Sequence, residues 1–289
     1  MMSKIALLYE EDQSETLQFV PYLTTLLQQH GYDTYIINLS REEHKLNDPQ
    51  LKDCKMLVVL GGDGSILHAA HLNAAQGTPI LGINFGRVGY LTELEPQELE
   101  HELPYYLDGD ESVWIDERAM LHATVKQGGE QQEFVALNDI MIARGTWPRG
   151  VYVKTWIDNQ YLDTFYGDGI ILATATGSTA YNLSVGGPIM HPRVEACILT
   201  PIAPHLAENR ALVIPQRSII KFQIATNAQS GIFSADGQWN CEVQDGSTVI
   251  IQKSSQTTRF IRRKPPVHFY QVIHSPQQVI DEPSAGQPE

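Results

Sequence analysis

The stretch that decides the fold is Met56-Leu57-Val58-Val59-Leu60-Gly61-Gly62-Asp63-Gly64-Ser65. Its five apolar residues suffice for a fully buried strand, and three glycines around one carboxylate follow at once. Leu67, Ala70 and Ala74 then recur at helical spacing, which predicts a helix. A strand that ends in a glycine-rich turn at a helix start presents backbone N–H groups to an anion. An acidic side chain in that turn has to share a metal or accept a hydroxyl proton, which indicates phosphoryl transfer.

Alternating strand and helix patterns lie on both sides of that stretch. Further strands are predicted at residues 4–9, 34–38 and 80–83, and further helices around 20–27 and at 98–107. The first of these helices carries Val20, Leu23 and Leu27 on one face, and Gly31 is placed to end it. The alternation is typical of a parallel sheet covered on both faces. Ligands of such sheets bind at the carboxyl ends of the strands, where Asp63 falls.

The second half of the chain has the pattern of antiparallel strands. Gly128-Gly129 and Asp158-Asn159 separate alternating apolar segments, which predicts two hairpins, and a short helix is predicted within 192–204. We therefore expect an α/β N-terminal domain with a parallel sheet plus a β-rich C-terminal domain, and a site between the domains. The expected boundaries are a Rossmann-like domain at 1–112, with 265–276 packing back on it, a β-rich domain at 113–264 and a disordered tail at 277–289.

Composition narrows the class of protein. The chain has 289 residues and a net charge of −14, so its surface would repel nucleic acid and anionic lipid, and we expect neither as a partner. Three cysteines without a C-x-x-C spacing are typical of reduced thiols in a cytosolic protein. The sequence shows no signal peptide and no apolar run of the roughly 20 residues that a membrane helix needs. We expect a cytoplasmic protein.

Two further segments carry side chains suited to binding a nucleoside. Asn138-Asp139 follows a predicted strand, and a neighbouring amide and carboxylate can bond ribose hydroxyls or a base edge, although an ordinary Asx turn is the favoured explanation of a lone pair. The stretch from Tyr166 to Asn182 places an acid between two glycines, then a buried strand, then small residues and hydroxyls. Solvated turn chemistry is the alternative for that loop. Neither a Walker-type phosphate loop nor a dinucleotide fingerprint is present in the sequence.

Taken together, these motifs resemble the signature set of the NAD kinase family. The series comprises Gly61-Gly62-Asp63-Gly64, Asn138-Asp139, Asp168-Gly169, Thr176 to Tyr181, Gly186-Gly187-Pro188, the block at 200–205 and Asp236-Gly237-Gln238. It covers residues 56 to 240 in the family's order. The first motif alone is shared with diacylglycerol and sphingosine kinases and with 6-phosphofructokinases, whereas the whole series is specific to NAD kinases.

The resemblance implies phosphorylation of the 2′-hydroxyl of the adenosine ribose of NAD, which gives NADP, from ATP or polyphosphate with a divalent metal such as Mg²⁺. It implies a homodimer or homotetramer. It assigns Asp63 as the base, with Gly61, Gly62 and Gly64 as the phosphate loop. The residues implied to bind NAD are Gly64, Tyr90, Asn138, Asp139, Asp168, Thr176, Thr179, Ala180, Tyr181 and Ala203.

Several alternatives stay open at this point. A lipid or sugar-phosphate kinase would share the Gly-Gly-Asp-Gly turn, and a non-enzymatic dinucleotide sensor would share the pocket without needing Asp63. The spacing of His68 and His71 fits a metal on a helix, but a solvated or packed pair is favoured because no third ligand is in sight. Tyr166 stands where many family members have a basic residue, so the preference between NAD and NADH is open, as are the phosphoryl donor, the metal ligands and regulation.

Overall fold

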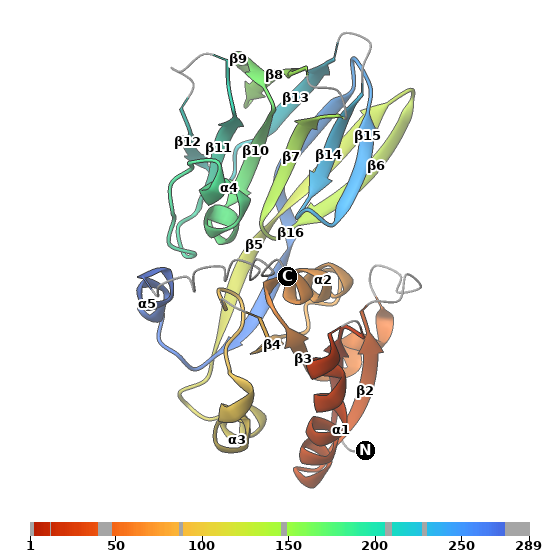
Figure 1. The fold of residues 1–289 in the computed structure, drawn as a ribbon, viewed down its shortest axis with the longest axis vertical. Coiled ribbons are helices and arrows are strands. Elements are labelled where there is room, and N and C mark those ends of the chain that lie inside the picture. The colour runs from red at the N-terminus through yellow and green to blue at the C-terminus, as the bar shows by residue number, and fades with distance from the viewer. Residues whose placement is uncertain are drawn as a thin grey trace, which may run out of the picture.

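Four parallel strands form the sheet of the N-terminal lobe in the computed structural model. Their spatial order is β2 (Tyr32–Asn38), β1 (Ser3–Tyr9), β3 (Cys54–Gly61) and β4 (Ile80–Asn84). Helix α2 (Asp63–Leu72) covers one face, while α1 (Ser14–Gln29) and α3 (Leu99–Asp108) cover the other (Figure 1). Leu57 and Val59 pack on the α2 side, whereas Met56, Val58 and Leu60 pack on the opposite side. Burial on both faces explains why the sequence of β3 is apolar throughout.

The structure describes residues 3–11, 13–39, 48–86, 89–145, 149–205, 210–226 and 230–274. The predicted tail at 277–289 lies outside the described residues. The division of the chain at residues 112 and 264 stays a prediction. Helix α5 (His268–His274) follows the last strand, and its Phe269 and Tyr270 rings lie 5.1 and 5.6 Å from the ring of His191.

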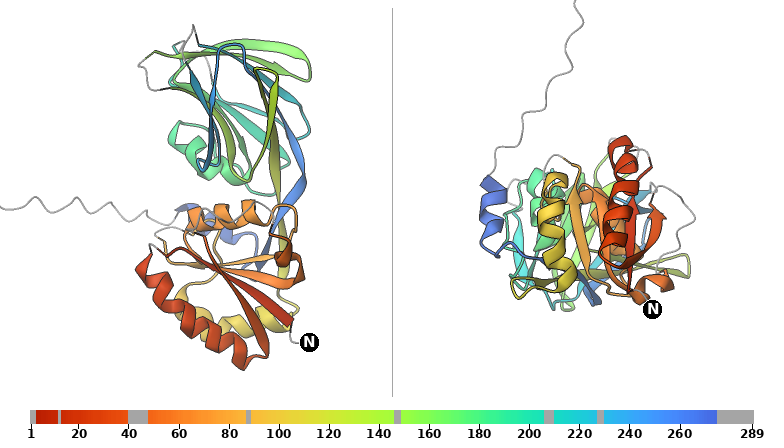
Figure 2. Two further views of the ribbon diagram at one scale, coloured as in Figure 1. Left: turned by 90° about the vertical axis from the view of Figure 1, so that its right-hand side faces the viewer. Right: turned by 90° about the horizontal axis from the view of Figure 1, so that it is seen from below.

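Two long strands join the lobes. β5 (Trp114–Gln127) and β16 (Thr248–Arg262) pair with each other in antiparallel fashion and run from one lobe into the other (Figures 1 and 2). At the lower end, Phe260 of β16 pairs in parallel with Ile80 of β4. At the upper end, β16 pairs with β13 (Ile220–Ala225). The parallel sheet therefore continues into the C-terminal lobe without an edge at β4.

The C-terminal lobe is a sandwich of two antiparallel layers. The upper halves of β5 and β16 extend through β6 (Glu130–Ala136) on one side and β13, β8 (Val151–Ile157) and β9 (Gln160–Gly167) on the other. The second sheet has the order β12 (Leu212–Pro215), β11 (Ala196–Ile202), β10 (Gly169–Thr174), β7 (Asp139–Arg144), β14 (Gly231–Ala235) and β15 (Trp239–Val243). Alternate residues of both sheets form one buried core. The short helix α4 (Tyr181–Ser184) follows β10.

The predicted fold class is confirmed, and so are the two predicted hairpins. β5 and β6 flank Gly128-Gly129, and β8 and β9 flank Asp158-Asn159, whose φ angles of 50° and 66° suit a tight hairpin turn. The helix expected within 192–204 is wrong, because β11 occupies most of this segment. All of its residues are buried between β10 and β12, and a short apolar run without alternation does not distinguish a buried strand from a helix.

All three cysteines have free thiols, with Cys54 and Cys197 buried and Cys241 partly buried. Within the part of the chain that the structure describes, no helix is long and apolar enough to cross a membrane.

Candidate active site

The glycine-rich turn lies where β3 ends and α2 begins. Gly61 has a φ of 155°, and a Cβ there would lie 2.2 Å from the hydroxyl of Ser65, so the turn itself requires glycine. A Cβ on Gly86 would lie 3.1 Å from the Cα of Gly62, so the next loop packs closely against the turn. Around Gly64, in contrast, a Cβ would meet nothing within 4 Å. Packing therefore does not explain the third glycine, and open space lies beside it.

Asp63 is the first residue of α2, and its carboxylate faces the loop that follows β4. One oxygen accepts a hydrogen bond from the backbone N–H of Leu91 at 2.9 Å, and the other accepts from that of Tyr90 at 3.3 Å. Burial raises the pKa of Asp63 above its usual value, against the lowering effect of these two N–H groups and of the positive charge of Arg262. The side chain is held in one orientation, and its raised pKa makes it a better proton acceptor than an ordinary aspartate.

The Asn138-Asp139 turn joins β6 to β7 and is buried, with exposures of 8% and 6%. The carbonyl of Asn138 accepts a hydrogen bond from the N–H of Thr174, at the end of β10. Burial, and then the charge of Asp236, raise the pKa of Asp139 to about 7. A carboxyl group with this pKa accepts hydrogen bonds as the anion and donates one as the acid, so it suits a ligand with both donors and acceptors.

The pKa of Asp139 gives a pH dependence of stability with a definite sign. Its ordinary pKa is 3.8, so between about pH 4 and pH 7 the folded protein keeps a proton that the unfolded chain has released. Stability from this group is full below about pH 4 and is lost as the pH rises to about 7. We expect Asp139→Asn, which cannot ionise, to gain unfolding free energy relative to the parent across this window, measured by urea unfolding at several pH values.

Asp110→Asn is the matched control for that prediction. Hydrogen bonds from Ser112 lower the pKa of Asp110, so its contribution to stability is present at high pH and is lost as the pH falls. As the pH rises, the unfolding free energy of Asp110→Asn should therefore fall relative to that of the parent, whereas that of Asp139→Asn should rise. If the unfolding free energies of Asp139→Asn and of the parent changed with pH in parallel, the raised pKa of Asp139 would be contradicted.

The loop from Thr176 to Tyr181 packs directly on the Asn138-Asp139 turn. A Cβ on Gly177 would lie 2.2 Å from the carbonyl oxygen of Asn138, so glycine permits this close approach. The hydroxyl of Ser178 is used internally, because it donates to a backbone carbonyl and accepts from the N–H of Met190. Thr179 and Ala180 are partly buried, and Tyr181 is exposed. The loop is therefore rigid on its inner side and open at Thr179, Ala180 and Tyr181.

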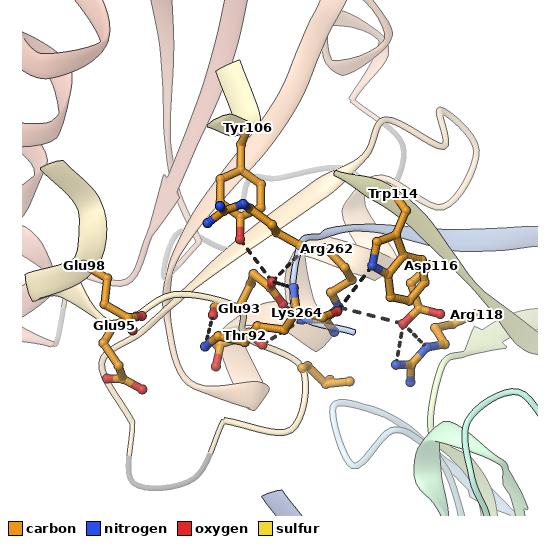
Figure 3. Close-up of polar contacts among 12 residues, drawn as sticks. Thr92, Glu93, Glu95, Glu98, Tyr106, Trp114, Asp116, Arg118, Arg262 and Lys264 are labelled. Carbon is orange, nitrogen blue, oxygen red and sulfur yellow. Dashed lines mark hydrogen bonds and ion pairs between the residues drawn. The ribbon is translucent and has the colours of Figure 1, made fainter. Parts of the chain in front are cut away.

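A chain of buried charges connects the loop at Thr176 to the N-terminal lobe. Arg118 donates to the hydroxyl of Thr176 at 3.3 Å and pairs with Asp116 at 2.6 Å. Asp116 faces Arg262 at 3.8 Å, and Arg262 pairs with Glu93 at 3.2 Å. Figure 3 shows the two acids and two arginines in sequence between β5, β16 and the loop after β4. This series of charged residues ends at Glu93, two residues from Leu91, whose N–H holds Asp63.

The structure does not bring all the predicted residues together. Asp168 and Ala203 lie beside the start of β10, whereas Thr176 follows its end. Six residues at about 3.3 Å each separate the two ends by roughly 20 Å. Asp168 is exposed there and pairs with Arg144 at 2.7 Å. Tyr166 stacks between Tyr152 and His205, with ring centroids 4.2 and 4.9 Å away.

Sequence reasoning missed the connections made by Asp236 and His71. The resemblance included Asp236 as part of a motif and assigned it no contact, yet its buried carboxylate bonds to His71 at 2.7 Å and to the Asn138-Asp139 turn. His71 is 2% exposed, in agreement with a packed histidine rather than a solvated one. Within the described ranges, no group of three or more His, Cys, Asp or Glu side chains is arranged to hold a metal ion. The sequence carries no distinguishing signal here, because Asp-Gly is common in turns whether or not the carboxylate has buried partners.

Comparisons with known proteins cover nearly the whole chain. Residues 5–111 match the ATP-NAD kinase N-terminal domain, and residues 137–263 match the ATP-NAD kinase C-terminal domain. An NAD kinase of Caldanaerobacter subterraneus subsp. tengcongensis is 37% identical over 271 residues, which is 91% of this chain and 95% of the relative. An NAD kinase of Heliobacterium modesticaldum is 35% identical over 268 residues, which is 90% of this chain and 94% of that relative.

Two solved structures have the same fold. Yeast NADH kinase complexed with NADH gives a TM-score of 0.83 at 23% identity, over 95% of this chain and 88% of that chain. An NAD kinase from Archaeoglobus fulgidus in complex with ATP gives a TM-score of 0.74 at 26% identity, over 93% and 97%. The similarity therefore extends over both lobes.

Proposed function

The chain belongs to the NAD kinase family, and on this premise we propose that it transfers a phosphoryl group from ATP to the 2′-hydroxyl of the adenosine ribose of NAD. One observation carries the proposal. A carboxylate with a raised pKa stands at a helix N-terminus, fixed by two backbone N–H groups, with open space beside it at Gly64. A single hydroxyl-directed base in a phosphate-binding turn fits transfer to an alcohol better than simple binding.

We propose for each residue the role that the resemblance implies, and the surroundings described above support it. Asp63 accepts the proton of the ribose hydroxyl as charge develops in the transition state. Gly61, Gly62 and Gly64 let the phosphate chain of the donor approach the start of α2, whose N–H groups and dipole favour anions. Asn138 and Asp139 bind the ribose and base edges, and Thr176, Thr179, Ala180 and Tyr181 surround the adenine, while Tyr90 borders the dinucleotide beside Asp63.

A divalent metal such as Mg²⁺ completes the proposal. Mg²⁺ keeps several waters and is usually bound through one or two carboxylates together with substrate phosphates. Asp63 acts as the base in this proposal and is not assigned to the metal, so the phosphates of ATP and bound waters would bring the metal's ligands. The metal would neutralise charge on the transferring phosphoryl group, while this chain's residues orient the hydroxyl and receive its proton.

We propose that Asp168 and Ala203 join the pocket from a second copy of the chain. Both lie roughly 20 Å along β10 from the Thr176 loop, which is too far for one short subsite. We propose a homodimer or homotetramer in which these residues bind the nicotinamide end of the dinucleotide held by a neighbouring subunit. Sedimentation of the parent protein with and without NAD would measure the assembly, and a monomer active at full rate would exclude it.

The direct test is NADP formation by the purified protein with Mg-ATP and with polyphosphate, side by side. We expect phosphorylation of NAD with ATP, and loss of activity when the metal is chelated. Phosphorylation of a diacylglycerol or of a sugar phosphate instead would favour the lipid or sugar kinase alternative, and the net charge of −14 already counts against the lipid version. Tight NADP binding without turnover under any donor would favour a sensor. A cytoplasmic location is part of the same proposal, since ATP and NAD are both present there.

A further inference from the structure

Asp236 lies in the three-residue turn between β14 and β15 and is 8% exposed. Its carboxylate accepts hydrogen bonds from three consecutive backbone N–H groups, those of Leu137 at 2.7 Å, Asn138 at 2.7 Å and Asp139 at 2.9 Å. In return, its own N–H donates to the carbonyl of Asp139 at 3.0 Å. Successive N–H groups that converge on one anion form a concave nest. The anion in this nest is a side chain of the protein itself.

The same turn contacts both ends of α2. His71, near the end of the helix, meets the carboxylate of Asp236 through Nε2 at 2.7 Å, and because a carboxylate can only accept, the imidazole donates. Gln238, two residues along the turn, donates to the carbonyl of Gly64 at 2.9 Å. Asp63 lies between Gly64 and the end of β3, at the start of this helix. One short hairpin turn therefore contacts the helix that bears Asp63 and the turn that bears Asn138 and Asp139.

We propose that Asp236, with His71 and Gln238, is a positioning residue that fixes the base Asp63 relative to the nucleoside-binding turn at Asn138 and Asp139. The inference rests on the proposed function, because the roles of Asp63, Asn138 and Asp139 are taken from that function. Asp63 and Asn138 come from different lobes and from segments about 75 residues apart in sequence. A misplacement of about 1 Å between reacting groups can cost about a hundredfold in rate. Four charge-assisted hydrogen bonds on one buried carboxylate are strong enough to hold this geometry.

Backbone conformation alone does not account for an aspartate here. Asp236 has a φ of 53° and Gly237 one of 71°, and asparagine adopts such angles as readily as aspartate. Asparagine cannot accept at both positions, since its amide nitrogen would face either the N–H of Leu137 together with the ring of His71, or the N–H groups of Asn138 and Asp139. The residue type is therefore explained by the four donors around it. Such a carboxylate is expected where two segments have to be held in a fixed relation.

His71 offers a milder test than Asp236, whose loss would leave three backbone N–H groups unpaired and could unfold the protein. One side of His71 lines a cavity of about 500 Å³ between α2, the β5–β6 hairpin and β16, so small changes of side-chain shape can be accommodated. His71→Phe keeps a planar ring and removes the donor. His71→Gln keeps an N–H donor near the position of Nε2. The pair therefore separates the hydrogen bond from the shape of the side chain.

For His71→Phe we expect the KM for NAD to rise about tenfold and kcat to fall by a similar factor, as for the loss of one charge-assisted hydrogen bond. The KM for ATP should change by less than about twofold, and His71→Gln should restore both NAD parameters to within about threefold. Leu103→Ala, in the buried face of α3 away from the turn, is the matched control for lost stability. It should lower the melting temperature while KM and kcat stay at the parent values.

Parent-like kinetics of folded His71→Phe, or a His71→Gln variant as impaired as His71→Phe, would overturn the proposal. A rise of KM in Leu103→Ala would also overturn it, because lost stability would then explain the effect. Asn138→Ala separates this inference from the function on which it rests. If Asn138→Ala raises the KM for NAD and His71→Phe does not, the positioning role fails and the pocket stands. If Asn138→Ala leaves the KM unchanged, the pocket itself is wrong and the inference fails with it.

Discussion

Asp63→Asn is expected to lower kcat for NADP formation by about 10²- to 10⁴-fold, the usual contribution of a positioned general base. The fold should persist, because the asparagine oxygen can still accept the 2.9 Å hydrogen bond from Leu91 and the weaker partner at Tyr90 N–H is 3.3 Å away. Burial raises the pKa of the carboxylate, so it accepts a proton more readily than an exposed aspartate. Amide nitrogen cannot replace it, since it has no basic lone pair at neutral pH.

The measurement needs three readouts for this variant. Steady-state kinetics give kcat, equilibrium binding gives the affinity for NAD, and a thermal melt shows whether the fold is intact. The exposed Asp110→Asn variant is the matched control and should keep the parent kcat. Retention of more than about a tenth of the activity by folded Asp63→Asn would exclude the role of base. Loss of NAD affinity with an unchanged kcat would make Asp63 a binding residue instead.

Local patterns predicted the elements that form locally. The apolar run of β3, the glycines after it and the spacing of Leu67, Ala70 and Ala74 were enough to predict a strand, a turn and a helix, and all three are present. Gly128-Gly129 likewise predicted the hairpin of β5 and β6. Each of these segments forms its hydrogen bonds, or shows its apolar periodicity, within about 20 residues. A local stretch of sequence is therefore enough to predict it.

Long-range pairing was not predictable in the same way. β16 pairs with β4 at Phe260 and Ile80, 180 residues apart, and no local pattern signals such a partner. β11 was missed because burial between two neighbouring strands removed the alternation that identifies a strand. The resemblance supplied the candidate residues in order but not their places. The local pattern did predict a buried strand between Asp168 and Thr176, and β10 confirms that these residues lie at its opposite ends.

The polar residues that organise the site were also hidden in the sequence. Asp116, Glu117 and Arg118 form a run of three charged residues in β5, which is the pattern of a solvated segment, yet Asp116 and Arg118 are only 7% and 8% exposed. Asp116 contacts Arg262 and Arg118 contacts Thr176, and both of these partners come from distant parts of the sequence. Burial of a charge is decided by its partners, and those are set by tertiary structure.

Glu93→Ala should lower the unfolding free energy by about 3–5 kcal/mol, the usual effect of removing one partner of a buried ion pair. Glu93 is 5% exposed, and one of its oxygens accepts from the hydroxyl of Tyr106 and from the N–H groups of Arg263 and Lys264, at 2.9–3.0 Å. The other oxygen pairs with Arg262 at 3.2 Å. The variant would therefore leave a buried guanidinium without its nearest anion and three donors without an acceptor.

Glu93→Gln separates these two effects. Its oxygen can accept from the same three donors, while its amide faces Arg262, so its loss of stability should be smaller than that of Glu93→Ala and larger than that of an exposed Glu→Gln change. Glu117→Gln is that exposed control, since Glu117 and Arg259 are 3.6 Å apart with side chains 62% and 39% exposed, and it should cost less than about 1 kcal/mol. Urea unfolding of the three variants measures the series.

Loss of the Glu93 carboxylate should also reduce catalysis. Leu91 and Tyr90 hold the carboxylate of Asp63, and Glu93 anchors the end of their loop to Arg262, the last residue of β16, and to the two residues after it. If the loop loosens, Asp63 loses a fixed orientation, and kcat falls at temperatures where the variant is still folded. Unchanged kcat in folded Glu93→Gln would show that the loop keeps its shape without the ion pair. A parallel fall in stability and kcat would mean that the buried charges support the base as well as the fold.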